Sequence, residues 1–381
     1  MARALYIHWP FCAKKCPYCD FNSHVRDGVD VAAWEAALLA DMRHEAALAG
    51  GERLSSIFFG GGTPSLMPPA LVARLLAEAE RLWGFEPPIE ITLEANPSSV
   101  EAANFASLAV AGINRVSLGV QSFDDATLRW LGRLHDGASA RRSLAVAQEC
   151  FARVNFDLIY ALPAHTPEAW EAELAAALGH GTGHLSLYQL TIEPGTRFAS
   201  DVRRGVFAPL GDDAAADLYA LTQAITAAAG LPAYETSNHA RPGEESRHNL
   251  TYWRYQDYAG IGPGAHGRRG GVATVRHKKP ENYLRAVAER GHGIAEERNL
   301  PRTEQAAEAL LMGLRLTEGV DLAALSARFG LGALIDEPAA ARLAGLGMVW
   351  REDTRLGVTP QGRPLLDAVL GELVADALVE A

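Results

Sequence analysis

The stretch Cys12-Ala-Lys-Lys-Cys16-Pro-Tyr-Cys19 decides most of what this sequence predicts. It places three thiols within eight residues, in the spacing C-x3-C-x2-C, directly after a short apolar strand expected from Ala4 to Ile7. Three thiolates this close together can hold one iron–sulfur cluster. Because such a cluster has four irons, three ligands leave one iron open to bind and reduce a small molecule.

A zinc site is the first alternative. Structural zinc sites usually pair two close ligands with two distant ones, whereas here three thiols share one loop and the chain has no second cysteine pair. His8 or His24 would then supply the fourth ligand. Three reduced bystander cysteines are the second alternative. Cys150 stands alone in a predicted helix, where we expect a small core residue.

Composition limits the classes of function. The chain has 381 residues, of which 48% are hydrophobic, and a formal net charge of −11. The size predicts two or three domains or one large domain with a smaller one. The negative charge disfavours a nucleic-acid-binding protein. We expect neither a signal peptide nor an apolar run of ~18 residues that would span a membrane. The prediction is a cytoplasmic protein, with recruitment to a membrane partner left open.

Strands and helices alternate from residue 2 to about 240, which predicts parallel strands covered by helices. The expected strands are 3–8, 55–59, 89–94, 114–119, 153–158, 184–190 and a weaker one at 232–236. The expected helices are 31–49, 69–83, 101–111, 138–149, 167–179 and 213–229. Residues with functional chemistry directly follow the strands, at the carboxyl edge where parallel barrels build their active sites.

The rest of the chain has a different pattern. Residues 241–300 lose the alternation and are predicted to connect two domains, 1–240 and 301–381. The last domain is expected to be winged-helix-like, with helices and a small hairpin around 351–354. Its final helix is expected at 362–378. It holds seven Arg and no Lys against twelve Asp or Glu, which argues against DNA and favours a packing or lid domain.

Polar or glycine-rich motifs end four of the predicted strands. Phe59-Gly-Gly-Gly-Thr-Pro64 would let a ligand approach the backbone, although a tight turn explains it too. Glu94 would accept hydrogen bonds from a ribose or an ammonium group, or else cap a helix near Pro97. Gln121 and Asp157 end two further strands. Each alone could be a solvated loop residue, but together they suit a polar nucleoside-type ligand.

These motifs together resemble the radical S-adenosylmethionine (SAM) enzymes, and within them the oxygen-independent coproporphyrinogen III oxidase-like group. The resemblance covers nearly the whole chain and rests on the cysteine motif and four segments: Tyr6-Ile-His-Trp-Pro-Phe-Cys12, Gly60-Gly-Gly-Thr-Pro64, Glu94-Ala-Asn-Pro97 and Gly119-Val-Gln-Ser-Phe123. It implies a partial (β/α)6-type barrel and a [4Fe-4S] cluster held by Cys12, Cys16 and Cys19. It also implies reductive cleavage of SAM into methionine and a 5′-deoxyadenosyl radical.

The resemblance also assigns residues to SAM. The positions that it matches to SAM contacts are Tyr6, Tyr18, Gly61, Gly62, Thr63, Glu94, Gln121, Arg133 and Asp157. In this family SAM binds the open iron through its amine and carboxylate. The protein then binds and orients SAM and excludes water, and the cofactor carries out the radical step.

Two departures separate this chain from the oxidase proper, which has a fourth cysteine where this chain has Phe21, and an N-terminal arm that is absent here. Arg247-His-Asn-Leu-Thr-Tyr-Trp253 instead resembles the H-N-x-x-Y-W signature of HemW-type heme chaperones. The resemblance implies heme binding by His248, Asn249, Tyr252 and Trp253 and delivery of heme to acceptor hemoproteins. His248 would ligate the iron, the aromatic rings would lie against the porphyrin, and Arg241, Arg247, Arg254 or Arg276 would meet the propionates. The alternative is a structural histidine among core aromatic residues.

Three functions therefore remain open from the sequence. The first is a heme chaperone with a cluster, SAM and heme, for which cleavage of SAM is plausible. The second is coproporphyrinogen III dehydrogenase, and the third is a zinc-stabilised binding module. Lys14 and Lys15 lie within the cysteine motif, where they would favour an acidic electron donor such as a flavodoxin or ferredoxin. The alternative is a solvated loop.

Overall fold

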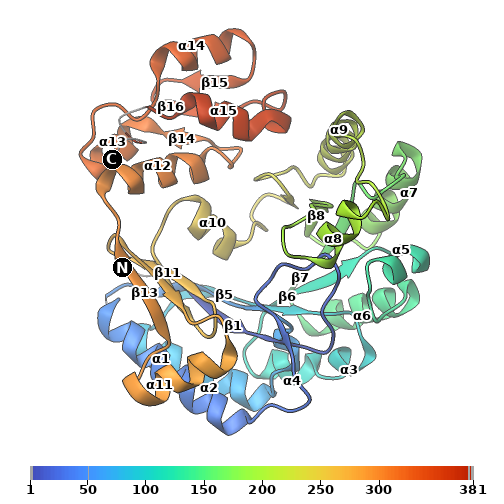
Figure 1. Ribbon diagram of the computed structural model, residues 1–381, viewed down its shortest axis with the longest axis vertical. Coiled ribbons are helices and arrows are strands. Elements are labelled where there is room, and N and C mark those ends of the chain that lie inside the picture. The colour runs from blue at the N-terminus through green and yellow to red at the C-terminus, as the bar shows by residue number, and fades with distance from the viewer. Residues whose placement is uncertain (1–2, 50, 376–377, 379–381) are drawn as a thin grey trace.

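The protein is built around one sheet, seen edge-on in the lower half of Figure 1. The computed structural model describes residues 3–49, 51–375 and 378. Its strands are β1 (Ala4–Trp9), β4 (Leu54–Gly61), β5 (Phe85–Ala95), β6 (Arg115–Gln121), β7 (Arg153–Tyr160), β8 (His184–Gln189), β9 (Asn238–Ala240), β10 (Tyr258–Ile261), β11 (His266–Arg269), β12 (Val272–Arg276) and β13 (Ile294–Asn299). Among the described residues this sheet has 11 strands, in the order β13-β12-β11-β10-β1-β4-β5-β6-β7-β8-β9. The strands from β10 through β1 to β8 run parallel to one another. The predicted α/β fold with a partial barrel is confirmed.

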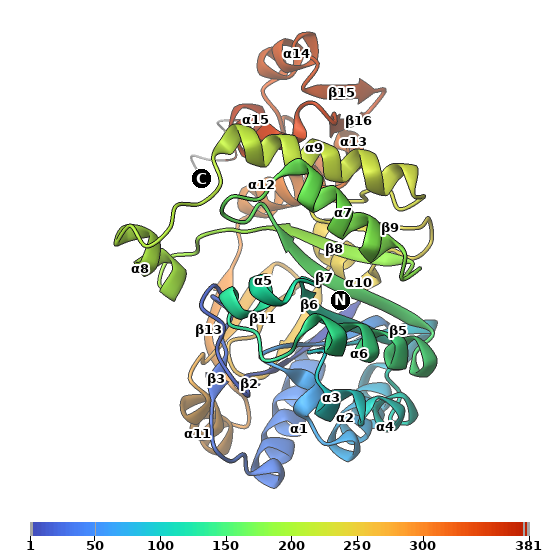
Figure 2. The ribbon, with the colours of Figure 1, turned by 90° about the vertical axis from the view of Figure 1, so that its right-hand side faces the viewer.

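Helices cover the outer face of the sheet, as Figure 2 shows. They are α1 (Val31–Leu48), α2 (Pro69–Trp83), α3 (Ser99–Ala102), α4 (Phe105–Val110), α5 (Asp125–Trp130), α6 (Gly137–Cys150), α7 (Pro167–Leu178), α9 (Asp212–Ala228) and α11 (Pro280–Arg290). The helix α8 (Arg197–Arg203) lies apart from them, beside the cysteine loop. Several begin at a side chain that accepts backbone N–H groups, such as Asp30, Asp136 and Thr166. Cys150 ends α6 and packs, half-buried, against the main core, as expected.

Both edges of the sheet differ from the sequence prediction. The expected strand at 232–236 is absent from this described part of the chain; β9 lies just beyond it and pairs antiparallel with β8. The segment 241–300, expected to be a connector, supplies β10 to β13 and the helix α10 (Arg247–Trp253). Its strand β10 pairs parallel with β1, and β11 to β13 continue the sheet antiparallel. The division of the chain at 240 and 300 stays a prediction, but this segment completes the barrel sheet.

Strand alternation sends apolar side chains outward and polar ones into the barrel. On β1, Leu5 and Ile7 are fully buried in the core beneath the helices, whereas Tyr6 and His8 line an interior cavity. On β5, Leu93 joins the core and Glu94 lines the interior. A period of two explains this division, because successive strand side chains point to opposite faces. The barrel interior is therefore polar, as a site for a polar ligand requires.

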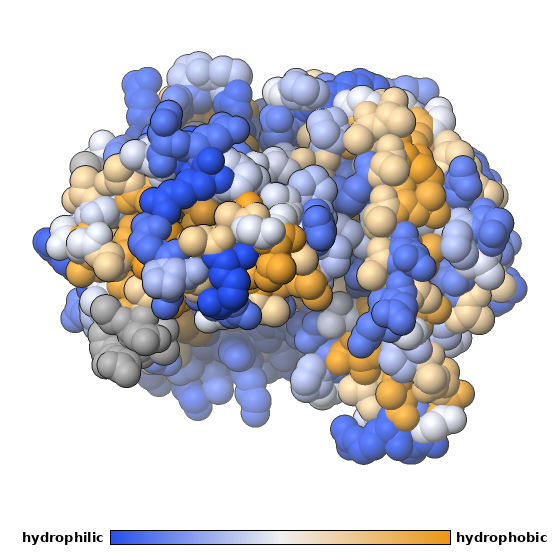
Figure 3. Space-filling view, turned by 90° about the horizontal axis from the view of Figure 1, so that it is seen from above, coloured by the Kyte–Doolittle hydropathy of each residue, from blue (hydrophilic) through white to orange (hydrophobic). Residues whose placement is uncertain are grey.

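The C-terminal part forms a second core above the barrel (Figure 1). Its elements are α12 (Arg302–Gly313), β14 (Val320–Asp321), α13 (Leu322–Phe329), α14 (Glu337–Gly345), β15 (Val349–Glu352), β16 (Arg355–Val358) and α15 (Leu366–Leu373). Its three strands pair antiparallel, and β15 and β16 form the predicted hairpin. The expected last helix reached 378, and its residues 376 and 377 lie outside the described residues. The face seen from above carries orange patches among hydrophilic residues (Figure 3).

Across the described ranges, we find no helix that is both long and apolar enough to span a bilayer.

Candidate functional site

Two adjoining cavities open at the carboxyl edge of the barrel strands. The smaller one, of about 140 Å³, is lined by all three cysteines of the C-x3-C-x2-C motif. The larger one, of about 920 Å³, extends along β1 and β10 to α10 and α12. Gly61 and Glu94 line both cavities, and so does Phe21. Ligands in the two cavities would therefore meet at these shared residues.

The cysteine loop is fixed by hydrogen bonds from neighbouring elements. Cys12 ends the short strand β2 (Phe11–Cys12), which pairs with β3 (His24–Val25), and its Sγ accepts a hydrogen bond from Thr63 Oγ1 at 3.4 Å. Arg133 Nη1 donates to Cys16 Sγ at 3.4 Å and to the Tyr18 hydroxyl at 3.4 Å. Burial raises the pKa of the Cys12 thiol. Without a bound metal, Cys12 therefore favours its protonated form.

Glycines at the end of β4 bring the backbone close to its neighbours. A Cβ on Gly61 would lie 2.6 Å from His8 Cε1, and Gly61 has a φ of +115°. A Cβ on Gly62 would lie 2.7 Å from the carbonyl oxygen of Phe11. Larger residues fit neither position. The three-glycine motif is thus required by close packing of β4 against β1 and the cysteine loop, and it also forms part of both cavity walls.

Two carboxylates face each other across the smaller cavity. Glu94 accepts a hydrogen bond from the Gly61 N–H at 3.1 Å, yet burial and the neighbouring Asp157 raise its pKa to about 8. Burial raises the pKa of Asp157 to about 6, against hydrogen bonds from Ser186 and Ser117. The ionised form of a buried carboxylate with a raised pKa is stabilised by a nearby cation or by hydroxyl groups that donate hydrogen bonds. The nearby Gln121 has a φ of +70°, a conformation uncommon outside glycine.

Asn96 and Ser117 belong to this site although the sequence assigned them no role. Asn96 Nδ2 donates to Thr63 Oγ1 at 3.1 Å, and Asn96 Oδ1 accepts from Arg133 Nη2 at 2.6 Å. It therefore connects the two side chains that hydrogen-bond to cysteine sulfurs. Ser117 Oγ donates to Asp157 Oδ1 at 3.2 Å. The signal for Asn96 was its place in Glu94-Ala-Asn-Pro97, and for Ser117 it was a polar inward position on β6.

The H-N-x-x-Y-W motif forms α10, and its residues divide between two environments. Asn249, Tyr252 and Trp253 line the larger cavity. His248 does not line it, because its ring is buried between Tyr6 and Phe58.

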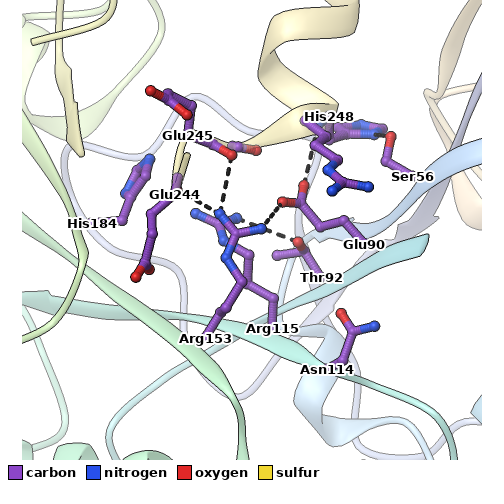
Figure 4. Close-up of polar contacts among 12 residues, drawn as sticks. Ser56, Glu90, Thr92, Asn114, Arg115, Arg153, His184, Glu244, Glu245 and His248 are labelled. Carbon is purple, nitrogen blue, oxygen red and sulfur yellow. Dashed lines mark hydrogen bonds and ion pairs between the residues drawn. The ribbon is translucent and has the colours of Figure 1, made fainter. Parts of the chain in front are cut away.

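Both ring nitrogens of His248 are engaged, and Figure 4 shows its ring beside Ser56. Nδ1 lies 3.3 Å from Ser56 Oγ, and Nε2 lies 2.5 Å from the Tyr252 hydroxyl. Burial, with Arg115 nearby, lowers the pKa of His248 to about 3, so the ring is neutral. Ligation of heme iron by His248 would require both the burial and these contacts to change. In this structure His248 fits the alternative of a structural histidine.

A buried ion pair anchors α10 to the amino end of the barrel strands (Figure 4). Glu90 accepts from the His248 backbone N–H at 3.2 Å and from Arg153 Nη1 at 2.6 Å. Arg153 also donates to the backbone carbonyls of Glu244 and Glu245, just before α10. The Glu90–Arg153 pair at this end of the barrel is thus satisfied by the chain itself.

None of the four arginines suggested for heme propionates lines the larger cavity. Arg276 is fully buried and paired with Asp41 and Glu45 beneath α1. Arg254 pairs with Glu318. Arg241 and Arg247 donate to backbone carbonyls, of Gly181 and Pro88. The cations that do line the cavity are Lys15, Lys278 and Arg315.

Comparisons with known proteins agree with this geometry. A family model described as the radical SAM superfamily matches residues 6–176, and one described as the HemN C-terminal domain matches residues 300–365. The chain is 36% identical to the protein named heme chaperone HemW of Escherichia coli, over 98% of each. It is also 42% identical to radical S-adenosyl methionine domain-containing protein 1, mitochondrial, of Mus musculus, over 83% of this chain and 74% of the relative. This chain belongs to the HemW-like radical SAM proteins.

A solved structure supports the same family. Coproporphyrinogen III oxidase (HemN) from Escherichia coli, described as a radical SAM enzyme, superposes with a TM-score of 0.81 and 25% sequence identity. It covers 97% of this chain and 89% of that chain. The family expected from the sequence is confirmed.

Membership of the radical SAM family implies a [4Fe-4S] cluster and SAM, and the residues of the smaller cavity fit both. No three His, Cys, Asp or Glu side chains in the described part of the chain gather closely enough to hold a single metal ion. The three thiols nevertheless line one cavity, as ligands shared by a larger cluster would. Arg133 Nε is buried without a hydrogen-bond partner beside Cys16, so a polar ligand at this wall would satisfy it. The site therefore contains three thiols that could hold the cluster, and an arginine and two carboxylates that could contact SAM.

Of the nine residues assigned to SAM, all but Tyr6 line the smaller cavity. Tyr6 lines the larger one, where its hydroxyl lies 3.0 Å from His8 Nδ1. His8, a candidate zinc ligand in the alternative reading of the cysteines, uses its other ring nitrogen on the carbonyl oxygen of Asn22 at 2.9 Å.

Proposed function

We propose that this protein is a heme chaperone that binds a [4Fe-4S] cluster, SAM and heme, and delivers the heme to acceptor hemoproteins. The observation that carries the proposal is the cavity of about 920 Å³ that adjoins the cysteine site. Its volume is in the range of about 300–1,000 Å³ that pockets for large ligands occupy. Tyr252, Trp253 and Tyr258 line it, so that apolar porphyrin faces would meet aromatic rings.

Cys12, Cys16 and Cys19 would hold the cluster, which when bound supplies the electron for reductive cleavage of SAM. Glu94 and Asp157 would accept hydrogen bonds from the ribose or ammonium groups of SAM. Arg133 would orient the cofactor's carboxylate or the cysteine sulfurs through its fixed fork. The remaining SAM contacts proposed here are Tyr18, Gly61, Gly62, Thr63 and Gln121. Tyr6 would act at the boundary of the two cavities.

The test is anaerobic reconstitution followed by heme titration of the full chain. We expect one heme per chain from absorption changes. On mixing with an apo-hemoprotein such as apomyoglobin, heme should appear in the acceptor. Running the transfer with and without SAM shows whether the cofactor changes its rate. A reconstituted protein that binds no heme at a defined stoichiometry would contradict the proposal.

Coproporphyrinogen III dehydrogenase is the second candidate, and the structural similarity to that oxidase over 97% of this chain favours it. Phe21 stands where the oxidase has its fourth cysteine; its side chain is 60% exposed and lines both cavities. An anaerobic assay with coproporphyrinogen III, SAM and a reductant separates the two functions. We expect no protoporphyrinogen, and its formation at a catalytic rate would favour the enzyme.

An acidic electron donor such as a flavodoxin or ferredoxin is proposed for the outer side of the cysteine loop. Lys14 and Lys15 lie there with Arg129 and Arg197, around a depression that also exposes Cys16. A basic rim next to the electron-accepting group would increase the association rate. Reversing both charges (Lys14→Glu with Lys15→Glu) should slow reduction by such a donor several-fold and should not change reduction by dithionite. Equal rates with the protein donor would contradict this surface.

We also propose a reducing compartment such as the cytoplasm, because three unpaired thiols for a cluster persist where disulfides do not form. Fractionation of cells that express the tagged chain tests this location.

A further inference from the structure

The larger cavity contains histidines other than the one in the H-N-x-x-Y-W motif. Among the described residues, those that line it are His8, His24 and His266. A heme iron needs an imidazole nitrogen with a free lone pair, so the hydrogen-bond partners of each ring decide which of them is available.

Two of these three rings are already engaged. His8 is 5% exposed and uses both nitrogens, on the Tyr6 hydroxyl and on the Asn22 carbonyl oxygen. His24 Nε2 lies 3.2 Å from Asn22 Oδ1, and its ring also hydrogen-bonds to the backbone of Lys278. The ring of His266 is exposed and makes no hydrogen bond with any residue of the described ranges. It is thus the cavity histidine with both nitrogens available.

The backbone holds His266 in a fixed position. It begins β11, directly after the turn at Gly262–Ala265 that follows β10. The Gly264 N–H donates to the His277 carbonyl at 3.0 Å, and the Arg276 N–H donates to the Ala265 carbonyl at 2.9 Å. Asn22 Nδ2 donates to the Pro263 carbonyl at 2.8 Å and ties the turn to the loop after the cysteines. A side chain on such a support is placed precisely enough to ligate a metal.

The surroundings of His266 match the other parts of a heme. Lys278 is exposed, lines the same cavity and makes no ion pair with the described residues, so its ammonium is available for a propionate. Trp253 and Tyr258 line the same space.

We propose that His266, not His248, is an axial ligand of the iron of heme bound in the larger cavity, and that Lys278 pairs with a propionate. This inference rests on the proposed heme-chaperone function. It gives α10 two roles: His248 closes the barrel floor, and Tyr252 and Trp253 face the porphyrin.

The test compares His266→Ala, His248→Ala and His277→Ala in the full-length, reconstituted protein. His277 is a matched control, because it directly follows β12, the strand that pairs with β11, but does not line the cavity. Its Nε2 lies 3.2 Å from Arg290 Nη2. Ferric heme is titrated into each, and its absorption and electron paramagnetic resonance spectra are recorded. We expect His266→Ala to lower heme affinity at least tenfold and to remove the histidine-ligated spectrum. His277→Ala should behave as wild type.

His248→Ala should keep the wild-type heme spectrum and lower the melting temperature. A further variant, His266→Gly, should recover the wild-type spectrum when free imidazole is added. The inference is overturned if His266→Ala keeps the wild-type spectrum and affinity, or if folded His248→Ala alone loses them. If the wild-type protein itself binds no heme, the proposed function is wrong. This outcome differs from a wrong axial ligand, for which wild type binds heme and His266→Ala binds it equally well.

For the propionate, Lys278→Gln should weaken heme binding several-fold without changing the axial-ligand spectrum. Lys279→Gln, an exposed neighbour that does not line the cavity, is its control. Equal affinities in the two variants would remove Lys278 from the site.

Discussion

The two ends of the barrel contain similar residue types and differ in how these residues are satisfied. At the amino end, Glu90 is paired with Arg153 and caps the backbone of α10, so this charge has protein partners. At the carboxyl end, the cysteines are half-exposed and free, Arg133 Nε is unpartnered, and Glu94 has a raised pKa. Polar groups whose partners belong to the chain indicate structure, and polar groups that lack them indicate a ligand.

The largest expected effect comes from the cysteines at the carboxyl end. Replacing any one of Cys12, Cys16 and Cys19 by Ser should remove nearly all cluster iron and acid-labile sulfide, because all three line the cavity and no other cysteine does among the described residues. Cys150→Ser is the control and should retain the cluster, since Cys150 lies at the end of α6. Iron and sulfide analysis after anaerobic reconstitution measures both. A full cluster in a Ser variant would contradict the assignment of the carboxyl end as a ligand site.

At the amino end the expected effect is on stability. Glu90→Ala leaves Arg153 without its buried partner and should cost about 3–5 kcal/mol of unfolding free energy. The control is Glu372→Ala, whose pair with Arg342 is exposed on both sides and should cost less than about 1 kcal/mol. Chemical denaturation measures both. A cost for Glu90→Ala no larger than that of the control would mean that the floor is not a structural ion pair.

Gly61→Ala tests the boundary between the two cavities. The added Cβ would contact the His8 ring, and the backbone would keep a left-handed φ, so we expect a loss of about 1–3 kcal/mol in stability and weaker SAM binding. Gly28→Ala is the control, because its Cβ would meet no heavy atom within 4 Å. Thermal unfolding and equilibrium dialysis with SAM measure the two effects. Wild-type behaviour would show that the β4–β1 contact has room to relax.

Glu94→Gln should act in opposite directions on binding and stability, so that its net effect on the SAM-bound protein is the smallest. We expect SAM to bind about tenfold more weakly, a loss of ~1.4 kcal/mol, and the SAM-free variant to melt a few degrees higher. The sign follows from the raised pKa: the unfolded carboxyl ionises near 4.5 and the folded one near 8, so wild type loses stability as the pH rises between these values.

The difference in melting temperature between Glu94→Gln and wild type should therefore grow from about pH 5 to about pH 8 and then level off. Comparing the two proteins at each pH removes the titration of SAM itself from the binding data. A melting difference that is constant with pH would contradict the buried state of Glu94.

Local pattern accounts for most of the barrel. Apolar runs that alternate with helical stretches predicted six of its strands within a few residues, and the spacing of the cysteines indicated the cofactor site. Residues such as Glu94 and Asp157 were found because they lie near the ends of the predicted strands, and the ends of parallel strands meet at one edge. The strands within residues 241–300 were not predicted, because they are short and join the sheet by pairing with β1 and with one another, which no local pattern encodes.

The sequence by itself determined the order of strands and helices and the three cysteines of one loop, because periodicity and spacing are local properties of a chain, and the resemblance of its motifs indicated the family. Tertiary structure alone decided that His248 is enclosed at the barrel floor while His266 faces the larger cavity. Only packing determines which of the two imidazoles has both nitrogens hydrogen-bonded within the protein. The same holds for the buried Arg276 and the exposed Lys278, which lie two residues apart.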